Sequence, residues 1–225
     1  MSSEDGAGTG PQVDAAVDQP RAGPTLVAVV GTLAEFRPDP VPYDPAALVR
    51  FVRDINPDLL CLDMTMQQWH ERDFGGLPAE YRDALLPLAE QTDIVVVPIG
   101  GLGDVGEGAP PMPVVHQGAR SWVLGRLRAT GAALQRGAAS PVAVGTGLRH
   151  ALAEVVLHLI DGVSGGKARQ RAVEHRAALE GRVLDLARRD PGRRVLVVVN
   201  ARHCHQLRRA LRRRPEVALV RHGRL

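Results

Sequence analysis

The sequence predicts an α/β fold with a mainly parallel central sheet, flanking helices and a helical insertion before the fourth strand. Short, continuous apolar runs alternate along the chain with longer amphipathic segments, which is the pattern of strand–helix repeats. The apolar runs are rich in Val and Leu and lack polar alternation, as expected for strands buried on both faces. Hydrophobic residues make up 44% of the chain and aromatic residues 3%, so the core must consist of Leu, Val and Ala.

The length of 225 residues fits one domain. Residues 1–23 are rich in Gly, Ser, Asp, Gln and Pro and have little apolar content, which predicts a disordered leader. Residues 24–225 are expected to form a single α/β domain, with a helical insertion over about 119–165.

The first half of this domain contains three of the predicted strands. They are expected at Thr25–Gly31, Leu59–Asp63 and Asp93–Ile99. A helix should begin after Asp44, because Asp is a good N-cap and Pro follows it in the first turn. A second helix is expected over Ala79–Gln91.

The second half begins with a Gly- and Pro-rich segment, Gly100–Gly118, that has no periodic pattern and predicts a long loop. The clearest strand of the chain follows later, at Arg194–Val199, and leads into a turn that carries two histidines. A last short strand is expected at Val217–Val220. Helices are expected over Trp122–Gln135, Gly147–Gly162, Lys167–Arg189 and about His205–Arg214.

Ligands of parallel α/β sheets bind at the carboxyl ends of the strands, and polar side chains follow several of these ends. Asp63 and His203 are candidates for an acid–base pair there. Glu35 follows the first strand and could join them, and Arg202 could bind an anionic group at the start of a helix. Structural roles remain open as well, with Asp63 as a cap, Glu35 as a solvated turn residue and His203 bonded to backbone.

Cys204 lies between His203 and His205 and is either a nucleophile activated by a helix N-terminus or a small buried hydrophobe. The two cysteines of the chain are far apart, without the CxxC spacing of a zinc knuckle.

The strand ends resemble those of the TraB/Tiki and erythromycin-esterase/ChaN-like superfamily. The similarity lies in the strand and turn Val27–Glu35, in the strand Pro57–Asp63 and in the helix–strand unit Glu174–Leu211. Gly31 and Thr32 match the first turn of the family pattern, whereas Ala34 stands where the family has a histidine.

The resemblance carries over further residue by residue. Asp63 occupies the place of a family glutamate, and His203 is the one residue kept from a Gly-x-Gly-His turn. His175 lies near the place where many members have an arginine. Family members with the full set are thought to hold a divalent metal or to hydrolyse peptides or esters. The sequence leaves the cofactor unknown, because Ala34 replaces one of the residues that would bind a divalent metal in the family.

These observations favour a divergent small-molecule enzyme that uses acid–base or hydrolytic chemistry at the carboxyl edge of the sheet, in secondary metabolism. The alternative is a non-catalytic protein on the same scaffold that binds haem, a metal or a hydrophobic small molecule. The expected partner is therefore a small-molecule ligand or substrate, and a homodimer remains open.

Other partner classes are disfavoured by composition. The formal net charge is +3, and the C-terminal arginines are more typical of an exposed helix face than of a nucleic-acid site, since aromatic residues for base stacking are scarce. No apolar run is long enough to cross a bilayer and no secretory signal is visible, so a cytoplasmic location without membrane partners is expected.

Overall fold

The computed structural model describes residues 23–33, 43–100, 118–137, 140–144 and 146–225. These residues contain a five-stranded sheet in the order β3-β2-β4-β1-β5, and every neighbouring pair is parallel. The strands are β1 (Thr25–Thr32), β2 (Leu59–Leu62), β3 (Val95–Pro98), β4 (Arg194–Asn200) and β5 (Val217–Leu219). The predicted α/β fold with a parallel sheet is thus confirmed.

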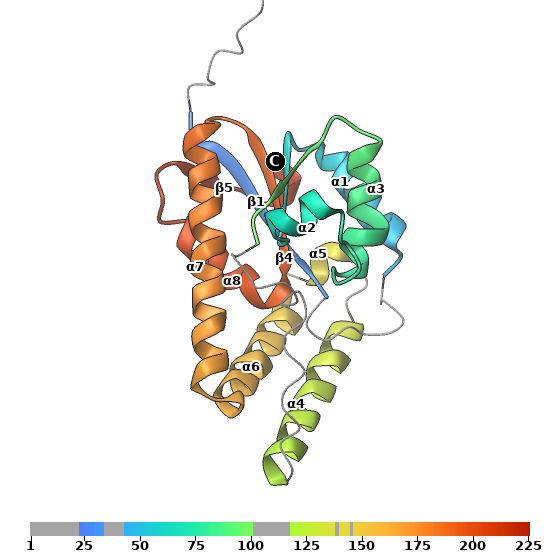
Figure 1. The fold of residues 1–225 in the computed structure, drawn as a ribbon, viewed down its shortest axis with the longest axis vertical. Helices are drawn as coiled ribbons and strands as arrows, with labels where there is room; N and C mark the ends of the chain where they lie inside the picture. The colour runs from blue at the N-terminus through green and yellow to red at the C-terminus, as the bar shows by residue number, and fades with distance from the viewer. Residues whose placement is uncertain (1–22, 34–42, 101–117, 138–139, 145) are drawn as a thin grey trace, which may run out of the picture.

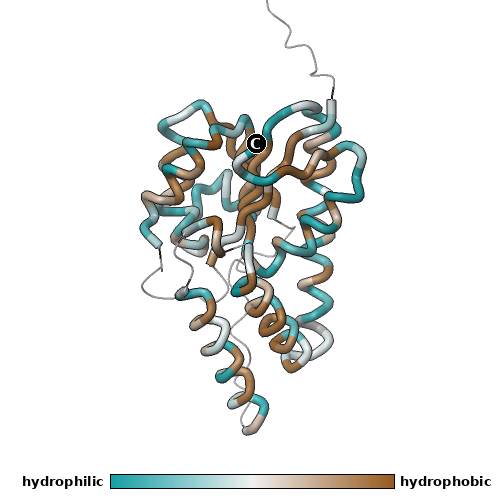
Figure 2. Tube along the Cα trace, turned by 180° about the vertical axis from the view of Figure 1, so that it is seen from behind, coloured by the Kyte–Doolittle hydropathy of each residue, from teal (hydrophilic) through white to brown (hydrophobic). Residues whose placement is uncertain are grey.

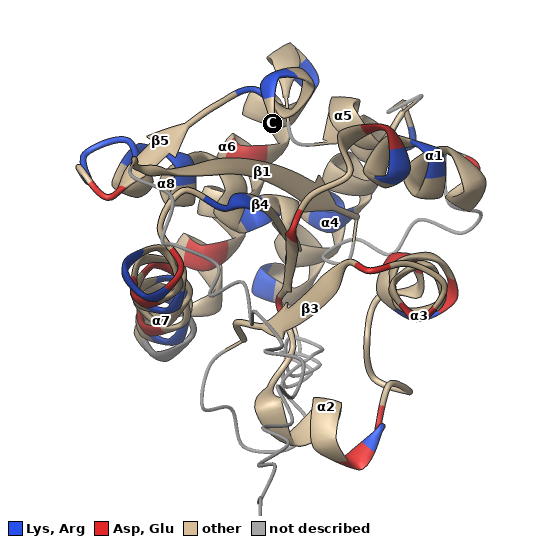
Figure 3. Ribbon diagram, turned by 90° about the horizontal axis from the view of Figure 1, so that it is seen from above, with Lys and Arg blue, Asp and Glu red and all other residues tan. Residues whose placement is uncertain are grey.

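Helices cover both faces of this sheet, because the buried strands present apolar side chains alternately to each side. Val30, Leu62 and Val198 share one core with α1 and the segment around Tyr81. Val29, Val197 and Val199 share a second core with α7 and α8. Figures 1 and 3 show the resulting three layers, with α7 on one side of the sheet and α1 and α3 on the other. The brown strands in the centre of Figure 2 are the apolar middle layer.

The helices between the strands follow the sequence prediction in order. The predicted insertion before the fourth strand is present and includes α4, α5 and α6, after which α7 leads back to β4. The helices are α1 (Pro45–Ile55), α2 (Met66–Glu71), the π-helix η1 (Glu80–Leu85), α3 (Leu86–Glu90), α4 (Ala119–Arg136), α5 (Pro141–Val144), α6 (Gly147–Ser164), α7 (Gly166–Arg189), α8 (Ala201–Leu211) and the 3₁₀ turn η2 (His222–Arg224).

The histidine-bearing turn after β4 is where the prediction was wrong. Helix α8 begins at Ala201, directly after the strand, and Asn200 caps it by accepting a hydrogen bond of 3.0 Å from the backbone N–H of Arg202. Because a side-chain cap replaces the expected loop, Arg202 and His203 lie in the first turn of a helix. The same capping chemistry forms α2, which was not predicted, since Thr65 and Gln68 make a reciprocal capping box.

Helices α4 and α6 pack against each other through a small core of their own, formed by Leu124, Val156, Leu157 and Ile160. Figure 1 shows this pair extending beyond the end of the sheet at which β4 passes into α8. Among the described residues, no helix combines the length and apolarity that a membrane crossing requires. The predicted leader, Glu35 and nearly all of the predicted loop after β3 lie outside the described residues.

Candidate functional site

The register of the sheet brings the ends of β2 and β4 together. Leu62 pairs with Val198, so Asp63 leaves β2 just before β4 reaches Asn200 and passes into α8. Asp63 and His203 therefore emerge from neighbouring strands at the same edge. The sequence predicted this juxtaposition from the order of polar residues at strand ends.

His175 reaches the same edge from a different layer. Helix α7 runs back to the start of β4, so its N-terminal part lies at the carboxyl end of the sheet. At about 1.5 Å per helical residue, the stretch from His175 to Arg189 measures about 21 Å. The stretch from Arg194 to Asn200 in β4 measures about 20 Å at about 3.3 Å per residue. His175 is therefore level with the end of β4, four residues ahead of the buried Leu179 and on the same helix face.

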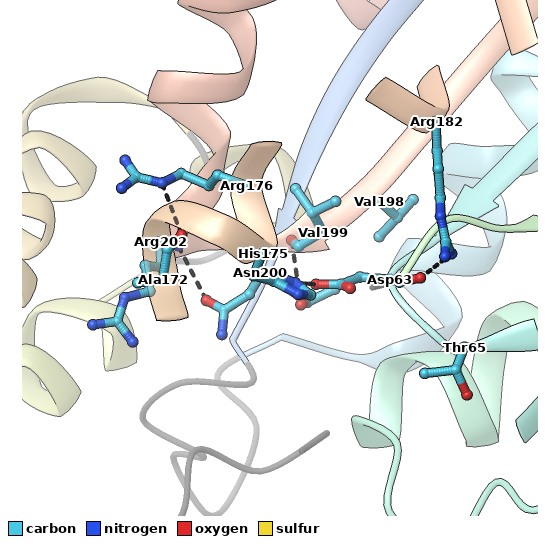
Figure 4. A network of polar contacts seen from close by, with 12 residues as sticks. Asp63, Thr65, Ala172, His175, Arg176, Arg182, Val198, Val199, Asn200 and Arg202 are labelled. Carbon is cyan, nitrogen blue, oxygen red and sulfur yellow. Dashed lines mark hydrogen bonds and ion pairs between the residues drawn. The ribbon is translucent and has the colours of Figure 1, made fainter. Parts of the chain in front are cut away.

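Asp63, His175 and His203 form one compact cluster, in which one potential ligand atom of each lies within 4.8 Å of the others. The Asp63 carboxylate oxygen Oδ2 is 3.0 Å from His175 Nε2. The rings of His175 and His203 are tilted against each other, with 5.1 Å between their centroids. Figure 4 shows Asp63 and His175 meeting at the sheet edge, with Arg176 and Arg202 to one side.

His203 is held as a neutral imidazole. Burial lowers its pKa to about 3, and the positive charges of Arg202 and Arg176 act in the same direction, although Asp63 partly opposes them. The residue is 6% exposed, and its Nδ1 has no hydrogen-bond partner among the described residues. A buried ring nitrogen without a partner is costly unless something binds to it, and the neutral ring is the form that ligates metals.

Contacts with the surrounding backbone fix the position of Asp63 at the end of β2. The buried Tyr81 hydroxyl donates a hydrogen bond of 2.6 Å to the Val198 carbonyl and accepts one of 3.4 Å from the Asp63 N–H. On the other side, Gly100 packs on the next turn, where a Cβ would lie 2.6 Å from the carbonyl carbon of Met64. Tyr81 and Gly100 thus hold the end of β2 from both sides.

A cavity of about 380 Å³ lies next to the cluster. His203 lines this cavity and is also one of the three residues of the cluster. The cavity walls come from α6, α7 and α8, and polar and apolar surface line it in about equal parts, with Leu157, Ala172 and Val173 among the apolar residues. Arg202 makes an ion pair with Asp161 inside it. His158 Nδ1 donates to the Glu154 carbonyl at 2.8 Å, and its Nε2 is 3.2 Å from the Gln206 amide nitrogen at the rim.

The four residues proposed from sequence have different places. Asp63 and His203 lie together in the cluster, and Arg202 lies beside them in the cavity wall. Glu35 lies outside the described residues. Asp63 contacts His175 directly, a pairing that strand ends could not reveal because His175 is in the middle of a helix.

Sequence reasoning also missed Tyr81, Asp161 and Arg176. The useful signal for α7 was the buried stripe Leu179, Val183 and Leu186, because extending it backwards by one turn reaches His175. Cys204, by contrast, is fully buried, and burial raises its pKa to about 12, which fits a small core residue and not a nucleophile.

We compared the chain with protein families, curated proteins and solved structures. No family model, curated protein or solved structure matches it. The resemblance to the TraB/Tiki and erythromycin-esterase/ChaN-like superfamily therefore stays a prediction from motifs, and the functional argument rests on the site itself.

Proposed function

We propose that this protein is a small-molecule enzyme that performs hydrolytic chemistry at the carboxyl edge of its sheet, with a divalent transition metal held by Asp63, His175 and His203. The observation that carries the proposal is the cluster of three ligand-type side chains within 4.8 Å, one of which is a buried imidazole. Two imidazoles and one carboxylate are a donor set found in catalytic zinc and iron sites, as opposed to closed structural ones.

The state of His203 favours metal ligation over the acid–base role expected from sequence. A general base must accept a proton near the working pH, whereas the pKa of His203 is lowered to about 3. The same shift removes the competition between protons and a metal for this ring. The neutral ring with a partnerless Nδ1 thus fits a ligand better than a proton carrier.

Other features of the site position the proposed ligands and leave room for a substrate. The Tyr81 hydroxyl fixes the backbone of Asp63. The distance of 3.0 Å between Asp63 Oδ2 and His175 Nε2 is short enough for both atoms to reach one ion. A bound divalent metal would act as a Lewis acid and would lower the pKa of a bound water. The adjoining cavity of about 380 Å³ is of a size that admits a small molecule.

Metal binding by the chelator-stripped protein tests the proposal. We expect one zinc, nickel or manganese ion per chain in isothermal titration calorimetry. His175→Ala and Asp63→Asn should each weaken binding by about 100-fold or more, because each removes a direct ligand. His205→Ala is the matched control, since this exposed histidine is on the same helix as His203 and two residues away.

Turnover is then measured with p-nitrophenyl acetate and p-nitrophenyl phosphate in the metal-loaded protein. Hydrolysis that disappears in His175→Ala and persists in His205→Ala supports the enzyme. Stoichiometric metal without turnover of any ester, phosphoester or peptide would favour the ligand-binding alternative. Failure of the wild-type protein to bind any of the three metals would overturn the proposal.

A further inference from the structure

The cavity beside the cluster has more positive than negative side chains. Arg169, Arg176 and Arg202 line it, against the carboxylates of Glu154 and Asp161. Glu154 lies 3.4 Å from a ring nitrogen of His150 and 4.0 Å from one of His205. Among the described residues that line the cavity, three arginines thus stand against two carboxylates.

Arg176 is the residue that this imbalance affects most. It is half-buried, and its Nε donates a hydrogen bond of 3.1 Å to the Ala172 carbonyl in its own helix. No carboxylate of the described residues lies within ion-pair distance of Arg176, since Asp161 makes its ion pair with Arg202. The guanidinium of Arg176 is therefore the group in the cavity wall that is best placed to pair with an added anion.

We propose that this cavity is a binding site for the anionic group of a small molecule, a phosphate or a carboxylate, held by Arg176 together with Arg202 and Arg169. Guanidinium groups bind both anions through charge-assisted, bidentate hydrogen bonds. Leu157, Ala172 and Val173 give the cavity an apolar wall, so the rest of the molecule is expected to be partly apolar.

The position of His203 connects this site with the metal cluster. His203 lines the cavity and belongs to the cluster, so an anion held by Arg176 would place the attached group next to the metal ligands. The role of the cavity as a substrate subsite rests on the proposed function, whereas the binding of an anion does not require a metal. The substrate class of the enzyme is accordingly a small phosphate or carboxylate compound.

Calorimetry on the chelator-stripped protein at low ionic strength tests the anion site apart from the metal. The probes are phenylphosphate, phenylacetate and neutral benzyl alcohol. We expect one of the two anions to bind and benzyl alcohol not to bind, and the comparison of the anions identifies phosphate or carboxylate as the preferred group. Arg176→Gln should weaken anion binding by about 10- to 100-fold.

Arg209→Gln is the matched control, because Arg209 is exposed on α8. This substitution removes the same charge from a residue that does not line the cavity. It should leave anion affinity within about twofold of the wild type at moderate salt. His175→Ala should abolish zinc binding and retain anion binding, which separates the two sites. Absence of binding for both anions, or equal losses in Arg176→Gln and Arg209→Gln, would overturn the anion site. A wild-type protein that binds the anion and no metal would overturn the proposed function alone.

Discussion

The two histidines of the cluster differ in their surroundings, although both lie near Asp63. His203 is deeply buried at the start of α8, whereas the side chain of His175 is 34% exposed on α7. His203 is held in place by packing, while His175 is oriented through its hydrogen bond to Asp63. The pair thus combines a buried imidazole with one that is partly open to solvent.

Tyr81 is the residue whose hydroxyl should matter most for the geometry of the cluster. Burial raises its pKa well above the usual value, so the hydroxyl keeps its proton and donates to Val198. Tyr81→Phe should lower the free energy of unfolding by about 1–2 kcal/mol and should also weaken zinc binding, because the Asp63 N–H loses its acceptor. Chemical denaturation and zinc titration measure the two effects.

Tyr43→Phe is the matched control for this prediction. Its buried hydroxyl donates a hydrogen bond of 3.2 Å to Glu80, and in the described part of the chain it makes no hydrogen bond with Asp63 or Val198. A similar loss of stability with unchanged zinc affinity is expected. Equal zinc affinity in Tyr81→Phe and the wild type would show that the hydroxyl does not position Asp63.

Both cysteines are expected to be unreactive in the folded protein. Burial raises the pKa of Cys61 and of Cys204 to about 12, so each thiol keeps its proton up to a pH far above the usual value of 9.0. Because unfolding lets these thiols ionise near pH 9, their contribution to stability is complete below pH 9 and is lost as the pH rises toward 12. Iodoacetamide should label neither cysteine at pH 8 without denaturant. Rapid native labelling of Cys204 would restore its candidacy as a nucleophile.

At the level of elements, the strands and their ends were predictable because buried parallel strands have a plain apolar signature. Asp63 and His203 could be found by the rule that ligands bind at carboxyl ends of strands. His175 could not be found by this rule, because it lies within α7, and only the buried stripe of that helix points to its place at the sheet edge. The start of α8 was misjudged, since the cap at Asn200 replaced the expected turn.

Gly100 is the position at which two elements approach most closely at the site edge. A Cβ there would lie 2.6 Å from the Met64 carbonyl carbon, so Gly100→Ala must push apart the ends of β2 and β3. We expect a loss of about 1–3 kcal/mol in the free energy of unfolding and weaker zinc binding. Gly76→Ala, where no atom lies within 4 Å of the added Cβ, should change stability by less than about 0.5 kcal/mol. Unchanged zinc affinity in Gly100→Ala would show that the close contact between Gly100 and Met64 does not affect the cluster.

At the level of the whole molecule, the homodimer that the sequence left open stays a prediction. Helix α6 exposes an apolar stripe with spacings of four, three and four residues, at Leu148, Leu152, Val155 and Leu159. The order of these spacings is the same from either end of the stripe. A second copy of α6 packed antiparallel would therefore place its apolar residues at matching positions. Sedimentation velocity should show a dimer that Leu152→Glu dissociates and Ala129→Glu on α4 does not. A monomer at every micromolar concentration would contradict the homodimer.

The sheet and the helical layer on one of its faces together create the site, since Asp63 follows β2 and the two histidines come from α7 and α8. This convergence explains why composition and motifs could locate the edge but not the full ligand set. Helix α6 of the insertion before β4 supplies one wall of the cavity beside the cluster. The chemistry proposed for the protein depends on that convergence.

Anomalous diffraction from zinc-soaked crystals tests the central claim most directly. We predict one anomalous peak per chain at about 2.0–2.2 Å from a side-chain nitrogen of both His175 and His203 and from an Asp63 carboxylate oxygen. The peak should vanish in crystals of His175→Ala and persist in those of His205→Ala. Zinc bound elsewhere, or an empty cluster at saturating zinc, would contradict the account.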